Sequence, residues 1–113
     1  KVAEAIEMLE QALSLQPNEP LSYTRLGSLL SLRAELLKPS AKKAAMVQRS
    51  LELGKAATEM QPLHFFFRQM YGFLLLKNAS YDEAAAQLRH ALQLIQSPQK
   101  AVCVETLPLR TGC

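Results

Sequence analysis

The sequence has little from which to build an active site. It contains no tryptophan, two histidines and a single aspartate among 113 residues, and no glycine-rich phosphate loop. Enzymes need convergent acid, base or nucleophilic groups, so we expect no enzyme and assign no catalytic residue. Neither His64 nor His90 has a partner at metal-ligand spacing, and we therefore expect no metal site and no cofactor.

Cysteines and long apolar runs are also scarce. Cys103 and Cys113 are the two cysteines and both lie near the end of the chain, so neither a disulfide framework nor a zinc site holds the fold. They either pair with each other or stay free. No apolar run approaches the roughly 20 residues of a membrane helix, and no signal-peptide pattern opens the chain. We expect a soluble segment, cytoplasmic or bacterial periplasmic, cut from a longer protein because Lys1 already lies within a helical pattern.

The charge balance is mild. The formal net charge is +3, well short of the basic field typical of nucleic-acid binding, so no nucleic-acid partner is expected. One basic cluster is present, formed by Lys38, Lys42, Lys43 and Arg49. It has no interleaved aromatic residues that could stack on bases, and Glu35 and Glu52 lie nearby. The pattern favours a solvated hairpin tip over a nucleic-acid or membrane patch.

Apolar residues recur at spacings of three and four along most of the chain, which predicts an all-α fold. Prolines and caps divide it into about five helices. The first ends at Pro17, and the second runs from Pro20 to about Lys38 because Pro39 disfavours helical geometry before it. The expected third, fourth and fifth helices run from a Ser40 cap to about Gln61, from Pro62, and from a Ser80–Glu83 capping box. We expect a helical domain over 1–98 and an irregular tail over 99–113.

Two later features concern the fourth helix. Its aromatic segment from Phe65 to Phe73 is apolar around most of its circumference, which predicts a central helix packed on several sides. The sequence Asn78-Ala79-Ser80 matches a glycosylation acceptor, but it also reads as a plain turn between helices, which we favour.

The chain repeats itself. The first and fifth predicted helices share a small–bulky–small pattern at identical spacings, and the second and fourth share an aromatic, glycine and bulky pattern. The residues are Ala5, Leu9 and Ala12; Ala84, Leu88 and Ala91; Tyr23, Leu26, Gly27 and Leu30; and Tyr71, Gly72 and Leu75. This pattern resembles that of the tetratricopeptide repeat family, in which small residues let helices approach and bulky ones fill the gaps between them. The resemblance covers residues 1 to about 98 and implies a solenoid of helical hairpins.

The middle repeat departs from the family pattern. From Pro20 to His64 it spans 45 residues, against the usual 34. The surplus of about 11 residues corresponds to about three helical turns, so we expect an overlong hairpin whose tip, "LLKPSAKKAA" at 36–45, projects past its neighbours. A repeat of this length also falls in the HEAT and armadillo range, which leaves a different helical solenoid open.

The resemblance also implies a function. In tetratricopeptide arrays the first helices of the hairpins line a concave groove that binds partners. Carried over to this chain, the groove residues are Leu21, Thr24, Arg25, Ser28, Phe66, Gln69, Met70 and Phe73. The carboxylate-clamp branch of the family, which uses Lys, Asn and Arg in the groove, is disfavoured because Thr24, Ser28 and Met70 replace the expected types. We expect a non-enzymatic module that binds a protein or peptide on its concave face and helps to assemble a complex. The alternative is a sensory or regulatory domain that binds a small ligand and belongs to a larger protein, such as a bacterial membrane-anchored or transcription-regulating one.

Overall fold

The computed structural model describes residues 1–96 of the 113, and this part consists of five helices with no strand. The helices are α1 (Val2–Leu15), α2 (Pro20–Glu35), α3 (Ala41–Met60), α4 (Phe65–Lys77) and α5 (Tyr81–Gln96). The predicted all-α fold with five helices is thus confirmed. The predicted tail over 99–113, with Cys103 and Cys113, lies outside the described residues.

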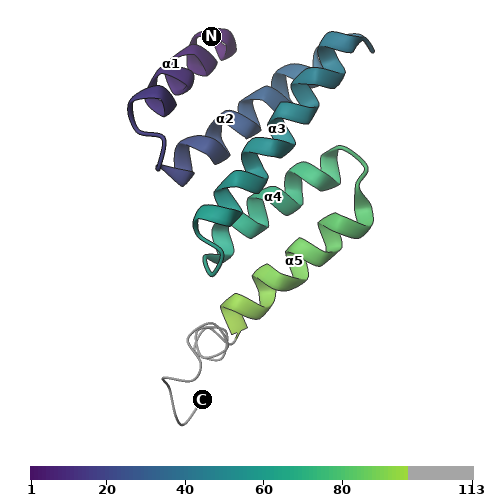
Figure 1. Cartoon of the computed structure of the whole chain (residues 1–113). Coiled ribbons are helices and arrows are strands. Elements are labelled where there is room, and N and C mark those ends of the chain that lie inside the picture. Colours follow the sequence, from purple (N-terminus) through teal and green to yellow (C-terminus); the bar gives the residue numbers. More distant parts are fainter. Residues whose placement is uncertain (97–113) are drawn as a thin grey trace.

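Successive helices pack as hairpins that stack side by side (Figure 1). Helix α2 packs on α3 and α4 on α5, while α1 packs on α2. The two hairpins meet through α4, which contacts both α2 and α3. The Cα radius of gyration is 15.9 Å, with extents of 53 × 33 × 19 Å, against about 13 Å for a compact domain of this size. The predicted stack of helical hairpins is therefore elongated.

The core divides between the two hairpins. In the first, Leu26 and Leu30 of α2 and Leu53 of α3 are buried, and the partly buried Ile6, Leu9 and Leu13 of α1 pack against them. In the second, Tyr71 and Leu75 of α4 pack with Ala84 of α5. Helix α1 covers the first cluster without burying any residue of its own fully. The prediction that the fourth helix is central is confirmed, since α4 contacts α2, α3 and α5.

Helix α3 matches the repeat pattern least well, yet its small residues lie where three helices meet. The Ser50 hydroxyl is buried and donates a hydrogen bond of 2.8 Å to the Gly27 carbonyl of α2. A Cβ on Gly54 would lie 2.9 Å from Cδ1 of Leu74 and 3.1 Å from Cδ1 of Tyr71 on α4. The absence of bulk at these two positions allows α3 to approach both first helices.

Two predicted helix boundaries are wrong by three residues. Helix α2 ends at Glu35 rather than Lys38, because the backbone tightens: the N–H groups of Leu36 and Leu37 donate to carbonyls three residues back. Helix α4 begins at Phe65 rather than Pro62. Here His64 has extended backbone angles and caps the helix, with its Nδ1 accepting a 3.2 Å hydrogen bond from the Phe66 N–H.

The predicted capping box at the start of α5 is also wrong. The backbone N–H of Ser80 donates instead to the Leu75 carbonyl at 2.9 Å, closing the end of α4. Glu83 turns to α4 and accepts a 3.2 Å hydrogen bond from the Tyr71 hydroxyl. Burial, with the charges of Glu83 and Glu59, raises the pKa of Tyr71 to about 12, so the phenol keeps the proton that it donates.

The turn between α4 and α5 confirms that Asn78-Ala79-Ser80 connects two helices. Asn78 ends α4, and its Nδ2 donates to the Leu74 carbonyl at 2.8 Å. Ala79 has a positive φ of 64°, and its N–H donates to the Leu76 carbonyl. With the Ser80–Leu75 bond this is a Schellman closure, in which glycine normally occupies the left-handed position.

We expect Ala79→Gly to raise the free energy of unfolding by about 1 kcal/mol, because the left-handed conformation costs an L-residue about that much. Ala79→Val should lower it, since a β-branched residue tolerates this conformation poorly. Urea denaturation of the three proteins measures the order. A stability order other than glycine, alanine, valine would contradict the strained turn.

The long hairpin is present and its surplus is shared by both arms. Helix α2 has 16 residues against 13 in α4, and α3 has 20 against the 16 described in α5. Each arm is therefore about one turn longer than its counterpart, whereas an equal division of about three extra turns would give about one and a half. The five-residue connection 36–40 takes up further residues. Figure 1 shows the α2–α3 tip extending beyond the ends of α1 and α4.

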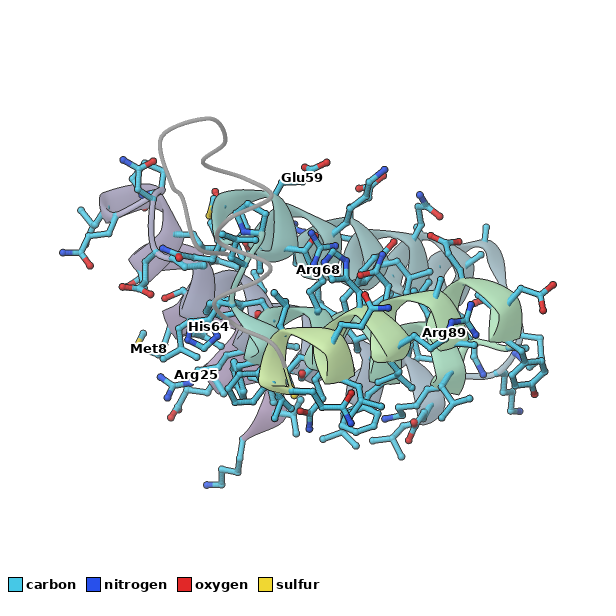
Figure 2. The ribbon with its side chains drawn as sticks, turned by 90° about the horizontal axis from the view of Figure 1, so that it is seen from below. Met8, Arg25, Glu59, His64, Arg68 and Arg89 are labelled. Atoms are coloured by element: carbon cyan, nitrogen blue, oxygen red, sulfur yellow. The ribbon has the colours of Figure 1, made fainter. Side chains whose placement is uncertain are left out.

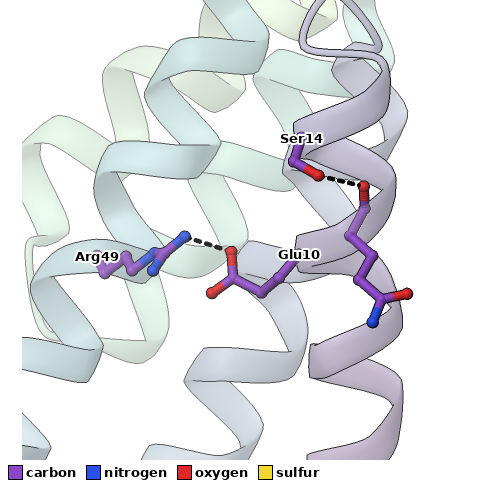
Figure 3. Close-up of polar contacts among 4 residues, drawn as sticks. Glu10, Ser14 and Arg49 are labelled. Atoms are coloured by element: carbon purple, nitrogen blue, oxygen red, sulfur yellow. Dashed lines mark hydrogen bonds and ion pairs between the residues drawn. The ribbon is translucent and has the colours of Figure 1, made fainter.

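Two members of the basic cluster have structural roles. The Lys43 ammonium donates to the Leu37 carbonyl at 3.3 Å. Arg49 pairs with Glu10 of α1 at 2.6 Å, beside a Ser14 hydroxyl that donates to the Gln11 carbonyl (Figure 3). The ion pair ties α1 to α3, although both side chains remain about half exposed, so its contribution to stability is small.

Candidate functional site

A hollow of about 400 Å³ opens where α1, α2 and α4 meet, and we call it the α2–α4 hollow. It is lined by Leu9, Leu21, Thr24, Arg25, Ser28, Leu29, Phe66 and Met70. Six of these residues are among the eight that the repeat resemblance picks out as a groove. The structure thus brings most of the predicted residues together in one concave surface.

Helical periodicity explains this convergence. Leu21, Thr24, Arg25 and Ser28 follow one another at spacings of three, one and three, which places them on one side of the first turns of α2. Phe66 and Met70 are four residues apart in the first turns of α4. Because α2 and α4 lie side by side, the two stripes become opposite walls of one hollow.

Gln69 and Phe73 do not line the hollow, so the structure does not bring them to the other six. Phe73 lies about two turns beyond Phe66 along α4, past the part of the helix that reaches the hollow. It is one of several large apolar side chains that are individually exposed on the α4–α5 hairpin. These are Phe65, Phe73, Leu76, Tyr81, Leu92 and Ile95.

Sequence reasoning missed Leu9 and Leu29. Leu9 comes from α1, which the repeat pattern assigns as a second helix and hence to the core rather than to a groove. Its position opposite the start of α2 depends on how α1 folds back at Pro17–Glu19. Leu29 is adjacent to Ser28, and its apolar character could have marked it, although the spacing alone also fits the core.

The chemistry of the hollow is apolar with one cation. Among its eight lining residues only Arg25 is charged, and its side chain is exposed. Within residues 1–96, the Arg25 side chain forms neither an ion pair nor a hydrogen bond. Figure 2 shows Arg25 at the same end of the molecule as Met8 and His64. The rim therefore presents an unpaired guanidinium beside apolar surface.

Thr24 is one of the two hydroxyl residues in the lining of the hollow, with Ser28. The residue is only 2% exposed, and its Oγ1 is buried without a hydrogen-bond partner in the described part of the chain. Buried hydroxyls nearly always have a partner, because leaving one unsatisfied costs about 1–3 kcal/mol. Thr24 is therefore a costly residue at this position.

A second hollow of about 320 Å³ lies among α3, α4 and α5, and it is polar. Its side chains largely satisfy one another: Arg68 donates to the Pro62 carbonyl and to Gln87, and Thr58 donates to the Lys55 carbonyl. Together with the Tyr71–Glu83 bond, these contacts make it a structural network rather than a set of free reactive groups.

Two further classes of site are missing from residues 1–96. This part of the chain holds no group of three acidic, histidine or cysteine side chains placed to bind a metal ion. It also holds no helix that is both long and apolar enough to cross a bilayer. Comparison with known proteins adds no name to the site: no protein-family model matches the chain, and no curated protein is significantly similar to it in sequence.

Proposed function

We propose that the chain is a non-enzymatic interaction module of the tetratricopeptide type, which binds a protein or peptide in the α2–α4 hollow and helps to assemble a complex. The observation that carries the proposal is the convergence of six groove residues in one hollow between adjacent first helices. A stack of hairpins presents such a surface as a consequence of its curvature.

The composition of the hollow supports a peptide partner. Leu21, Phe66 and Met70 offer an apolar floor and wall, and methionine and aromatic side chains are the residues that accommodate apolar anchors of partner helices and strands. No acid or base faces these residues from the lining, so the hollow is suited to binding and not to chemistry.

A small ligand is the second candidate, as part of a sensory or regulatory domain. The volume of about 400 Å³ falls within the range of about 300–1,000 Å³ typical of small-molecule pockets. Such a pocket also combines an apolar lining with a few polar groups, as Thr24 and Arg25 provide here. The two candidates differ in whether the occupant extends along the helices or fits inside.

Selection from a library of random peptides displayed on phage tests the proposal. We expect the wild-type protein to enrich related sequences and Phe66→Glu to enrich none, because a carboxylate in the apolar wall excludes an apolar anchor. Phe73→Glu is the matched control, since it makes the same change on the same helix outside the hollow. Circular dichroism verifies that both variants fold.

Failure of the wild-type protein to enrich any related sequences would argue against peptide binding. Equal enrichment by Phe66→Glu and the wild type would show that peptides bind elsewhere. In either case, a reproducible thermal shift with a small-molecule library that Phe66→Glu abolishes would favour the sensory candidate instead.

A further inference from the structure

The charge of the α2–α4 hollow has one sign. Arg25 is the only charged lining residue, and it is not neutralised by any carboxylate within residues 1–96. The ion pairs Arg49–Glu10 and Lys77–Glu35 involve other cations. A guanidinium left unpaired beside apolar surface is a ready partner for an incoming carboxylate.

We propose that the hollow recognises a peptide in which an apolar side chain lies close to an acidic one, the first entering the hollow and the second pairing with Arg25. This rests on the proposed function and specifies its partner. Arginine suits the role because its planar fork can donate two parallel hydrogen bonds to one carboxylate. The pair lies at the edge of apolar surface, where screening by water is weaker than on an open surface.

Thr24 supplies a second recognition group next to Arg25. Its Oγ1 has no partner among residues 1–96. Threonine in a helix populates two side-chain rotamers, so a change of rotamer redirects the hydroxyl while the residue stays in place. A polar group of the bound peptide then satisfies it. Valine has nearly the same shape without the hydroxyl, and would be the more stable residue if the position served only packing.

The single cation also sets limits on the partner. Nucleic acids are bound by several cations that neutralise successive phosphates, and one arginine is insufficient for that. A carboxylate, in contrast, needs one guanidinium. The carboxylate can belong to an Asp or Glu side chain or to a peptide C-terminus. We commit to the side chain, because the apolar lining continues on both sides of Arg25 through Leu21 and Leu29.

A charge-reversal selection tests this specificity. Against the displayed library, the wild-type protein should enrich peptides with an apolar residue near Asp or Glu. The Arg25→Glu variant should enrich peptides with the same apolar residue near Lys or Arg. A synthetic, C-terminally amidated peptide that was selected by the wild-type protein should bind this variant about tenfold more weakly. Lys38→Glu is the control: it changes the net charge equally, at the distant hairpin tip, and should leave both preference and affinity unchanged.

The role of the Thr24 hydroxyl is tested by a variant that should gain stability and lose affinity. Thr24→Val should raise the melting temperature, because an unsatisfied buried hydroxyl is removed, yet it should weaken binding of the selected amidated peptide several-fold. Thr24→Ser keeps the hydroxyl and should retain most of the affinity. If Thr24→Val is more stable and binds equally well, the hydroxyl has no part in recognition.

The outcomes separate the inference from the proposed function. Selected peptides that depend on Phe66 but show no acidic preference would overturn the inference and leave peptide binding standing. An acidic preference that persists in Arg25→Glu would overturn the role of Arg25. Binding that requires a free C-terminal carboxylate, lost on amidation, would overturn the assignment to an acidic side chain.

Discussion

Replacing Leu26 with alanine is expected to lower the free energy of unfolding by about 3 kcal/mol. Leu26 is fully buried and lies in the cluster that joins α1, α2 and α3. Truncation removes the burial of a large apolar side chain and leaves a cavity that rigid neighbours do not refill, and such changes cost about 2–5 kcal/mol. Urea denaturation followed by circular dichroism measures the loss.

Leu32→Ala is the matched control for this experiment. Leu32 lies on the same helix, and 42% of it is exposed, so its truncation should change stability by no more than about 0.5 kcal/mol. A similar loss in both variants would mean that Leu26 is not at the centre of the core, and would contradict the packing of α1 and α3 on α2.

Gly27→Ala is expected to lower the free energy of unfolding by about 2 kcal/mol, although alanine is the better helix former by about 1 kcal/mol. A Cβ at this position would lie 3.0 Å from the Ser50 carbonyl oxygen of α3 and 3.5 Å from Cδ1 of Leu74. Backbone in the middle of α3 cannot yield as a side chain can, so α2 and α3 must separate and strain or break the Ser50–Gly27 hydrogen bond.

Ala45→Gly reverses the comparison. Ala45 is exposed on α3, and only helix propensity applies there, so glycine should cost about 1 kcal/mol. Chemical denaturation should therefore show a loss of stability in both variants, because glycine is the more stable residue at position 27 and alanine at position 45. Stabilisation by Gly27→Ala would show that the two helices have room to adjust, and that the close approach is not needed for the hairpin.

Much of the fold follows from local signals in the sequence. Apolar spacing identifies five helices, and Pro17, Pro20 and Ser40 place several of their ends, with Ser40 accepting a hydrogen bond from the Lys43 N–H as a cap should. The boundary errors share one cause. At the end of α2 and just before the start of α4, the N–H groups of Leu36, Leu37 and His64 donate to carbonyls three residues back. Residue preferences do not show which hydrogen-bond partner a backbone group takes.

The candidate site could be predicted only in part. Leu21, Arg25 and Phe66 were picked out by the repeat resemblance, which assigns one side of each first helix to a groove. Whether a given turn of one helix faces a given turn of another depends on their relative shift, which the sequence pattern does not encode. Phe73 was misplaced for this reason, and Leu9 was missed because it reaches the hollow from a different hairpin position.

Occupancy of the hollow depends on how firmly α1 is docked. This helix buries no residue fully, and its packing against helices α2–α5 is mainly on α2. We therefore expect its docking to open at a lower free-energy cost than the contacts between the other helices. Leu9 is nevertheless one wall of the hollow. When α1 lifts away that wall is lost, and the apparent affinity for any occupant falls with the fraction of molecules in which α1 is docked. A mutation outside the hollow that loosens the Glu10–Arg49 contact would thus weaken binding. It would lower the fraction of molecules with α1 docked and would leave the contacts between the hollow and its occupant unchanged.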